Sequence, residues 1–313
     1  MQQPPLSDSA RANRVAGVVR AGAFSSAAAV LVWAGPACAE PEPAAPLGRA
    51  TETAAKGAAV STPSPGALSP VQLRADFGFL GVLQHDYQQG DPGSNFDFHD
   101  EGGQDVLFPV TRYIVNVDLA ERHRLSFVYQ PLELRTRERL RRGILIAGTA
   151  YAAGQDMEFT YRFPFYRASY EYTFWRDERT RFGIGGGLQI RNATIEFSHS
   201  DGTNLVSERD VGPVPLLHVG VRHELDAAWW FELDADGIYA PVKYLNGNDN
   251  GVEGAILDAN VRLGIDAVPH VSPFLGVRYL GGGAQGASDE GDLADYTSNW
   301  LQFVIVSLGA ELH

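Results

Sequence analysis

The sequence predicts an all-β chain that folds as a transmembrane, antiparallel, up-and-down meander β-barrel of about ten strands. Three observations favour this fold. Beyond residue 70, apolar and polar residues alternate with a period of two, as in strands with two different faces. Short turns alternate with long connections that are rich in Gly and Asp. No stretch after Glu40 has the roughly 20 apolar residues that a membrane-spanning helix needs.

The overall composition fits many twisted strands better than helices. The 313 residues include 16 Phe, 12 Tyr and 34 Gly, and the formal net charge is −13. Because binding to nucleic acid phosphates requires a basic surface, this charge argues against a nucleic acid partner.

Residues 1–39 have the three parts of a secretory signal peptide. Arginines up to Arg20 precede an apolar run over 21–33, and Ala37 and Ala39 supply the small residues of a cleavage site. The apolar run is too short to cross a bilayer as a helix. We therefore expect export from the cytoplasm and cleavage after Ala39.

The only cysteine, Cys38, lies in this segment. An alternative is a lipoprotein with Cys38 as its lipidated first residue, although Gly35 stands where a lipobox has a Leu-like residue. Cleavage after Ala39 would leave no thiol for disulfides or catalysis. Residues 40–70 are rich in Ala and Pro and cannot bury enough apolar surface to fold, which predicts a disordered periplasmic linker.

Residues 71–313 are predicted to form the barrel itself. The alternation is clearest where Leu233 and Ala235 point away from Glu232, Asp234 and Asp236. The same pattern, followed along the chain, predicts strands over Val71–His85, Leu107–Leu119, Arg124–Arg141, Asp156–Trp175, Arg181–Phe197, Asp210–Leu225, Ala228–Pro241, Ala255–Ala267, Val271–Gly282 and Tyr296–Leu312.

Two of these strands change the face that carries their apolar residues, each beside a proline. Tyr129 is followed by Leu132 on the other face, with Pro131 between them, and Pro164 marks a similar change. Because proline cannot donate to a β-ladder, we predict a β-bulge at each site. The bulges would either control curvature or re-aim a functional residue.

The connections place both ends of the barrel at the same membrane surface. Short turns fall around 121–122, 177–178, 226–227 and 269, and long connections cover 86–106, 142–155, 198–209, 244–254 and 283–295. In bacterial outer-membrane barrels the short turns face the periplasm and the long loops face the exterior.

Alternation alone does not say which face points outward, and a soluble lipocalin-like barrel would keep its apolar face inside. Lipid outside is favoured because one face carries too many charges for a dry core. Several strands also exceed the roughly 10 residues that cross a bilayer. Aromatic residues near strand ends suit interfacial girdles, and the candidates are Phe182, Phe197, Phe231 and Tyr239.

Residues 71–313 resemble the small outer-membrane β-barrel proteins of Gram-negative bacteria. The most local part of the resemblance is the final strand, where Ser307-Leu308-Gly309 matches their polar-x-Gly element. Leu312 stands where these proteins usually have Phe, and His313 follows it. The resemblance implies a location in the cell outer membrane. It also implies contact with outer-membrane lipid and lipopolysaccharide, and recognition of the C-terminal strand by the barrel-assembly machinery.

With the polar face inward, the barrel has a narrow and charged lumen. The predicted lumen-lining residues are Arg112, Asp118, Arg162, Arg222, Glu232, Asp234, Asp236, Asp258 and Arg262. Paired Arg and acidic side chains favour a salt-bridged structural plug. The alternative is a narrow conduit or a small-ligand site.

Alternate arginines stand at the external end of the third predicted strand. Arg137, Arg139 and Arg141 would present several guanidinium groups near the outer-leaflet headgroups. Guanidinium groups bind phosphates well, so we hypothesise contact with lipopolysaccharide phosphates. Pairing with acidic loops is the alternative.

The sequence favours a structural, adhesive or small-solute transport role. The sequence has no recognisable catalytic pair of nucleophile and base. His85 and His99 are each followed by an aspartate, but neighbouring side chains on a strand point to opposite faces, so these pairs are weak evidence for catalysis. A hydrolase at the rim, acting on lipid or peptide, is the alternative. The glycines of 183–187 are interpreted as room for larger neighbours, because no helix follows them to bind phosphate. The loop 246–251 lacks the Glu of a calcium site, and no metal or organic cofactor is implied.

Overall fold

The computed structural model describes residues 71–90, 92–226, 228–241, 252–287 and 296–313. The predicted signal peptide, the predicted linker and the loop 246–251 lie outside the described residues. Within the described residues, no helix is long and apolar enough to cross a membrane.

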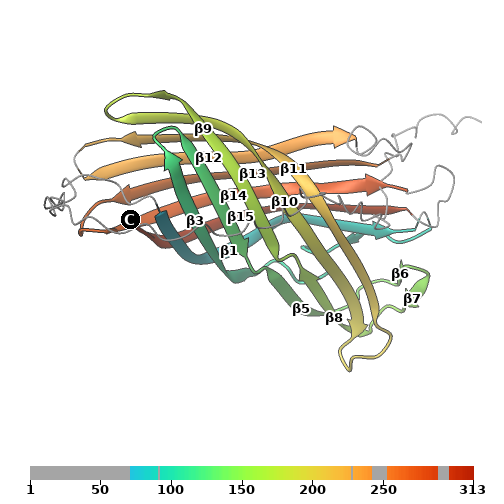
Figure 1. The fold of residues 1–313 in the computed structure, drawn as a ribbon. Helices are drawn as coiled ribbons and strands as arrows, with labels where there is room; N and C mark the ends of the chain where they lie inside the picture. Colours follow the sequence, from blue (N-terminus) through green and yellow to red (C-terminus); the bar gives the residue numbers. More distant parts are fainter. Residues whose placement is uncertain (1–70, 91, 227, 242–251, 288–295) are drawn as a thin grey trace, which may run out of the picture.

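The described residues form a closed antiparallel β-barrel with ten strand positions (Figure 1). The strands in chain order are β1 (Val71–Gln89), β2 (Phe96–Asp97), β3 (Leu107–Ala120), β4 (His123–Gln130), β5 (Glu133–Arg139), β6 (Ile144–Ile146), β7 (Thr149–Tyr151), β8 (Asp156–Arg162), β9 (Phe165–Arg176), β10 (Thr180–His199), β11 (Val206–Glu224), β12 (Trp229–Pro241), β13 (Glu253–Ile265), β14 (Val271–Gly286) and β15 (Thr297–Leu312).

The barrel closes because its first strand pairs with its last. β1 pairs with β3 on one side and with β15 on the other, and β10 pairs with β11 to complete the ring. β4 and β5 together occupy one strand position, as do β8 and β9. The predicted meander barrel of about ten strands is confirmed. The end with short turns is called periplasmic below, and the other end external.

The bulges predicted beside Pro131 and Pro164 are wrong. Gln130 pairs with Phe165, and the next pair of the ladder is Glu133 with Arg162. Each chain therefore has two residues between these pairs, so neither has an extra residue. The register is therefore continuous across both prolines. The apolar residues change face for another reason, which is a change in what surrounds the barrel.

In the periplasmic half, apolar side chains point outward and charged side chains point inward. On β1, Phe77 and Phe79 are exposed on the outside, whereas Arg74 and Asp76 are buried inside. Every strand position contributes exposed apolar residues to this outer belt. A belt of this kind is suited to lipid, and the charged side chains it encloses are kept away from the hydrocarbon.

In the external half the pattern is reversed. On β1, Leu80 and Val82 are buried inside, and after a register shift between Val82 and Gln84 the exposed Gln84 lies on the outside. Water surrounds a barrel beyond the bilayer, so apolar side chains there are buried in its interior. This reversal explains why Leu132 is out of phase with Tyr129 although the strand has no bulge.

The external half divides into two sheets that diverge from each other (Figure 1). The β11–β12 ladder ends at Leu217 and Gly237, although both strands continue. β5 pairs with β8 alone. On β11, Pro213 and Pro215 lie beyond this end of the β11–β12 ladder, toward the external side. Neither proline has an N–H that could donate to a ladder with β12. The sheet of β5, β8, β10 and β11 therefore extends away from the sheet of β12 to β15 and β1.

The aromatic girdle is only partly the predicted one. Phe197 is wrong as a girdle residue, because it is 1% exposed and lies in the core of the external half. Tyr239 is 67% exposed on the outer surface. At the periplasmic end, Trp175 and Trp229 are exposed and occupy girdle positions near the short turns.

Candidate functional site

A network of ion pairs fills the lumen of the periplasmic half, and we call it the lumen network. Strand alternation places its members on the inward face. Most of them line a cavity of about 60 Å³, which has room for a few water molecules. The members are Arg74, Asp76, Arg112, Arg167, Glu171, His218, Arg222, Glu232, Asp234, Asp236, Asp258, Arg262, Arg278 and Glu311.

Glu232 is the centre of the network near the periplasmic end. It accepts hydrogen bonds from Arg74 at 2.5 and 2.8 Å and from Arg262 at 2.5 Å. Arg74 also donates to Glu311 at 2.5 Å, and Arg222 donates to the same carboxylate at 3.2 Å. These side chains come from β1, β11, β12, β13 and β15, so the ion pairs connect strands across the lumen.

A second group of ion pairs lies higher in the lumen. Arg167 donates to Asp236 at 2.6 Å and lies 2.9 Å from Asp258. Arg278 donates to Asp258 at 2.6 and 2.8 Å. Both guanidinium groups lie over the ring of Phe165, 5.6 and 5.4 Å from its centroid. Phe165 therefore marks the level at which the charged lumen meets the apolar interior of the external half.

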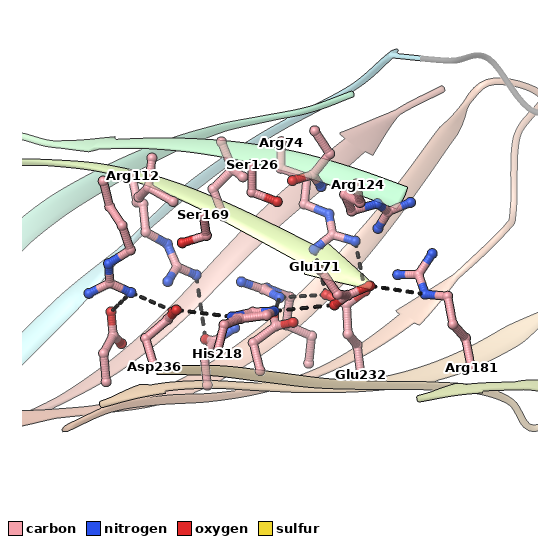
Figure 2. Close-up of a pocket in the computed structure, with 18 residues that line it drawn as sticks. Arg74, Arg112, Arg124, Ser126, Ser169, Glu171, Arg181, His218, Glu232 and Asp236 are labelled. Carbon is pink, nitrogen blue, oxygen red and sulfur yellow. Dashed lines mark hydrogen bonds and ion pairs between the residues drawn. The ribbon is translucent and has the colours of Figure 1, made fainter. Parts of the chain in front are cut away.

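His218 lies between two carboxylates (Figure 2). Its Nδ1 is 2.9 Å from Asp236, and its Nε2 is 3.2 Å from Glu171. A Cβ on Gly183 would lie 2.2 Å from Cδ of Glu171, and one on Gly220 would lie 2.5 Å from its Oε2. These two glycines therefore make room for the carboxylate that faces His218.

Arg162 is the one predicted lumen residue that the structure places elsewhere. It lies on the outer face of β8, where it forms ion pairs with Glu133 at 3.4 Å and Glu196 at 3.0 Å. The prediction assumed that the polar face points inward along the whole strand, but above the belt the polar face points outward. The other predicted residues project inward, namely Arg112, Asp118, Arg222, Glu232, Asp234, Asp236, Asp258 and Arg262.

Arg167 and Glu311 belong to the lumen network but are not among the lumen-lining residues that were predicted from the sequence. Arg167 lies beside the proline where a bulge was expected, so its face was not assigned. Glu311 alternates with the exposed Leu312 on the final strand. The period of two alone would have placed both residues inside.

An apolar plug fills the interior of the external half, and we call it the external plug. It consists of Phe96 and Phe98, from the connection between β1 and β3, both of which are 0% exposed. Phe98 stacks on His85 with ring centroids 4.4 Å apart, and Phe96 packs on Phe159 at 5.0 Å. Phe197 contacts both plug residues, at 5.3 and 5.4 Å. The plug therefore ties the two diverging sheets together.

The connection that carries the plug is also held by polar contacts. Arg142 donates to both carboxylate oxygens of Glu101 at 2.8 Å and to the carbonyl of Asn95 at 2.6 Å. The hydrogen bonds to Glu101 raise the pKa of the Arg142 guanidinium. The hydroxyl of Thr136 donates to the carbonyl of Gly102. These contacts fix the connection against β5 and the segment after it.

The three rim arginines are all exposed; Arg137 and Arg139 lie on the outer face of β5, and Arg141 follows the end of that strand. Arg137 donates to Glu158 at 2.8 Å, and Arg139 donates to the carbonyl of Gly154 at 2.8 Å. Arg141 forms no ion pair with a described residue. Arg139 also lies 3.8 Å from the carboxylate of Asp156. Pairing with neighbouring acids, which was the alternative from the sequence, therefore accounts for Arg137 and Arg139 but not for Arg141.

Two external histidines lie close to acids or hydroxyls. His199 Nδ1 is 3.2 Å from the hydroxyl of Thr203, which itself donates to Asp201 at 2.7 Å. In a catalytic triad the acid orients the histidine and not the hydroxyl. His99 Nδ1 is 2.6 Å from the carboxylate of the adjacent Asp100. Across the described ranges, no three His, Cys, Asp or Glu side chains are placed to hold a metal ion.

No known protein family and no curated protein matches the sequence. Among solved structures, the outer membrane protease OmpT from Escherichia coli is similar, with a TM-score of 0.44 and 8% identity over 80% of this chain and 99% of that one. Neisserial surface protein A gives a TM-score of 0.28 and 12% identity over 78% of this chain and 97% of that one. Ail, the attachment invasion locus protein of Yersinia pestis, gives a TM-score of 0.28 and 9% identity over 78% of this chain and 100% of that one.

None of these similarities indicates a role for the protein. Its class follows from its own architecture, which combines a closed antiparallel ring, an apolar belt and a charged interior. The protein is an outer-membrane β-barrel in contact with membrane lipid.

Proposed function

We propose that the protein is a non-conducting barrel with a structural or adhesive role, which presents its external half at the cell surface. The observation that supports this role is the filling of the interior at two successive levels. The lumen network pairs its own charges in the periplasmic half, and the external plug occupies the half above it. A solute would have to displace both.

The lumen network is costly to open. Glu232 and Arg262 are 2% exposed, and removing one partner of such a buried pair leaves a charge without compensation. Breaking buried pairs of this kind costs about 3–5 kcal/mol each. Thermal fluctuations would therefore open a path only rarely, which disfavours the small-solute transport role.

Conductance of the purified protein in planar lipid bilayers tests the proposal. We expect no stable current steps from samples whose insertion is verified by a boiling-dependent shift on a gel. A known porin, added afterwards to the same bilayer, is the positive control. Regular single-channel steps from the protein itself would contradict the proposal and favour a narrow conduit.

We also propose that Arg137, Arg139 and Arg141 contact lipopolysaccharide phosphates. The support is their exposure at and just beyond the end of β5 and the absence of an ion pair between Arg141 and any described residue. Guanidinium groups spaced along one face suit phosphates through paired N–H donors.

Replacing the three arginines by Gln should lower the lipopolysaccharide that co-purifies with the protein. The matched control replaces Arg122, Arg176 and Arg179 by Gln, because these arginines are exposed at the periplasmic end. Equal co-purification from both variants would remove the rim arginines as a lipid contact.

A further inference from the structure

One wall of the lumen cavity consists of small polar side chains that the lumen network does not use. Asn116, Ser126 and Ser169 lie in register on β3, β4 and β9, and all three line the cavity (Figure 2). Asn116 is 4% exposed and Ser169 is 7% exposed. None of the three side chains forms a hydrogen bond with a described residue, so their donors are available to a ligand in the cavity.

The size of the cavity limits what it can hold. Sites for organic ligands enclose about 300 Å³ or more, whereas this cavity has about 60 Å³. A Cβ on Gly187, the ladder partner of Ser169, would lie 2.5 Å from the Ser169 hydroxyl oxygen. Glycine at this position therefore leaves the hydroxyl group its place at the cavity, which suits a small ion.

Arg181 brings to the cavity a positive charge that lacks a close partner. Its guanidinium donates no hydrogen bond to a described residue, and its nearest carboxylate oxygen, Oε1 of Glu171, lies 3.8 Å from its Nε. The same Oε1 has no hydrogen-bond partner among the described residues, and the other oxygen of Glu171 faces His218. The guanidinium groups of Arg124 and Arg222 lie nearby and repel that of Arg181.

Ion pairs connect Arg181 to a set of lumen residues that carries one net positive charge. Its members, joined by contacts of 2.6 to 3.8 Å, are Arg181, Glu171, His218, Asp236, Arg167, Asp258 and Arg278. Because both ring nitrogens of His218 face carboxylates, both carry a proton. The set therefore contains four cations, three of them arginines, and three carboxylates.

The other charges of the lumen do not compensate this set at the cavity. Two further arginines that line the cavity form neutral pairs, each with its own aspartate. The ion pairs around Glu232 include one carboxylate more than their arginines, and Glu224 belongs to them. Because the Glu224 side chain is 38% exposed at the periplasmic end, water solvates its charge there. The positive charge beside the serines is therefore left to the cavity.

We infer that the lumen cavity binds one small monovalent anion of the halide class, held by the hydroxyl groups of Ser126 and Ser169 and by the charge of Arg181. A cation would be repelled by Arg181, and water would leave the net charge of the set in place. The Arg181 side chain is 25% exposed, so an ion reaches the site from the periplasmic end. The site goes beyond the structural or adhesive role proposed above.

Bromide is the probe for this site, because it has the charge of chloride and scatters X-rays anomalously. In crystals of detergent-folded protein grown with bromide, we expect an anomalous peak between Ser126 and Ser169. In solution, the thermal unfolding midpoint should rise with bromide concentration until the site is saturated. Sodium gluconate at equal ionic strength is the reference, because gluconate screens charges equally and is too large for the cavity.

Ser126→Ala combined with Ser169→Ala removes two donors without changing the charge of the lumen. We expect this variant to need about tenfold more bromide for half of the stabilisation. The matched control is Ser307→Ala, because Ser307 is 6% exposed but does not line the cavity. Arg181→Gln should abolish the response to bromide, whereas Arg179→Gln, at an exposed turn residue, should keep it. A boiling-dependent gel shift verifies that each variant is folded.

Water without a bromide peak in the cavity would overturn the inference, as would equal midpoints of the unmodified protein in bromide and in gluconate. An equal response of the serine variant and Ser307→Ala would overturn the assignment of the site. If Arg181→Gln does not fold, the serine variant and the crystals decide. Conductance is measured separately, so current through the barrel would contradict the proposed role without removing a saturable response to bromide.

Discussion

At the scale of single residues, the lumen network shows how charges can be buried inside a membrane protein. Arg74, Arg222 and Arg262 all contact Glu232, which is 2% exposed. Each guanidinium also meets a second carboxylate, so no charge of this group depends on one partner. The cost of removing these charges from water is offset only while the set is complete.

Replacing Glu232 by Gln should therefore destabilise the barrel strongly. The substitution keeps the shape but leaves three guanidinium groups facing a neutral amide, and we expect a loss of about 3–5 kcal/mol in the free energy of unfolding. Urea unfolding in lipid vesicles measures it. Glu133→Gln is the control, because that half-exposed ion pair is worth less than about 1 kcal/mol. Similar losses in both variants would contradict the argument.

Two aspartates in periplasmic turns give a prediction that depends on pH. Asp177 accepts from the amides of Arg179 and Thr180 at 2.8 Å, and these backbone hydrogen bonds lower its pKa. Asp226 has a lowered pKa for the same reason. Because the folded-state pKa lies below the unfolded value, the ionised carboxylates stabilise the fold above about pH 4, and the effect is lost as pH falls through the folded pKa.

Asp177→Ala should lower the thermal unfolding midpoint at pH 7, and the difference from the unmodified protein should shrink as the pH falls through the lowered folded-state pKa of Asp177. Circular dichroism in detergent at a series of pH values measures both midpoints. Asp177→Asn keeps an acceptor oxygen, so its unfolding midpoint at pH 7 should lie between those of Asp177→Ala and the unmodified protein. A difference that does not depend on pH would show that the carboxylate charge is not involved.

At the scale of elements, one strand can serve two environments without changing its register. Gln130 and Leu132 both point inward, one beside the lumen network and the other into the core of the external half. At this strand position and at the neighbouring one of β8 and β9, the chain therefore keeps its period of two while its apolar residues change face. Bulges were predicted because the sequence pattern was compared with a single environment.

The external plug is the element whose loss should have the clearest effect. Phe98→Ala removes a ring with 0% exposure and leaves a cavity against His85 and Phe197, at a cost of about 3–5 kcal/mol. We expect faster cleavage of the connection between β1 and β3 by proteases added to folded protein. Leu107→Ala, at a residue that is 67% exposed, should leave the cleavage rate unchanged. Equal rates for both variants would show that the plug does not hold the connection.

At the scale of the whole molecule, the barrel has two halves of opposite polarity. The periplasmic half is apolar outside and charged inside, and the external half is the reverse. The molecule therefore needs lipid or detergent around the belt and water around the external sheets.

Folded protein should migrate differently on a gel with and without boiling, because a closed barrel resists detergent until it is heated. Removing detergent without supplying lipid should cause precipitation, since the belt exposes side chains such as Phe77, Leu217 and Leu308. Protein that stays folded and soluble without detergent would contradict the assignment of the belt to lipid.

The sequence by itself determined the fold class and the approximate positions of the barrel strands. This was possible because strand alternation and the contrast between short and long connections are local properties of the chain. It also placed Glu232, Asp236 and Asp258 inside, since they alternate with apolar residues within the belt.

Only the tertiary structure decided where the polarity of the faces reverses. Arg162, on β8, and Phe197, on β10, were misplaced because their surroundings depend on the level at which lipid gives way to water. The residues of each strand alone do not specify this level. Which residues pair within the lumen network was decided by the closure of the barrel, which brings distant parts of the chain together. Arg74 and Glu232 are far apart in sequence, and only the curvature of the closed barrel brings them within 2.5 Å.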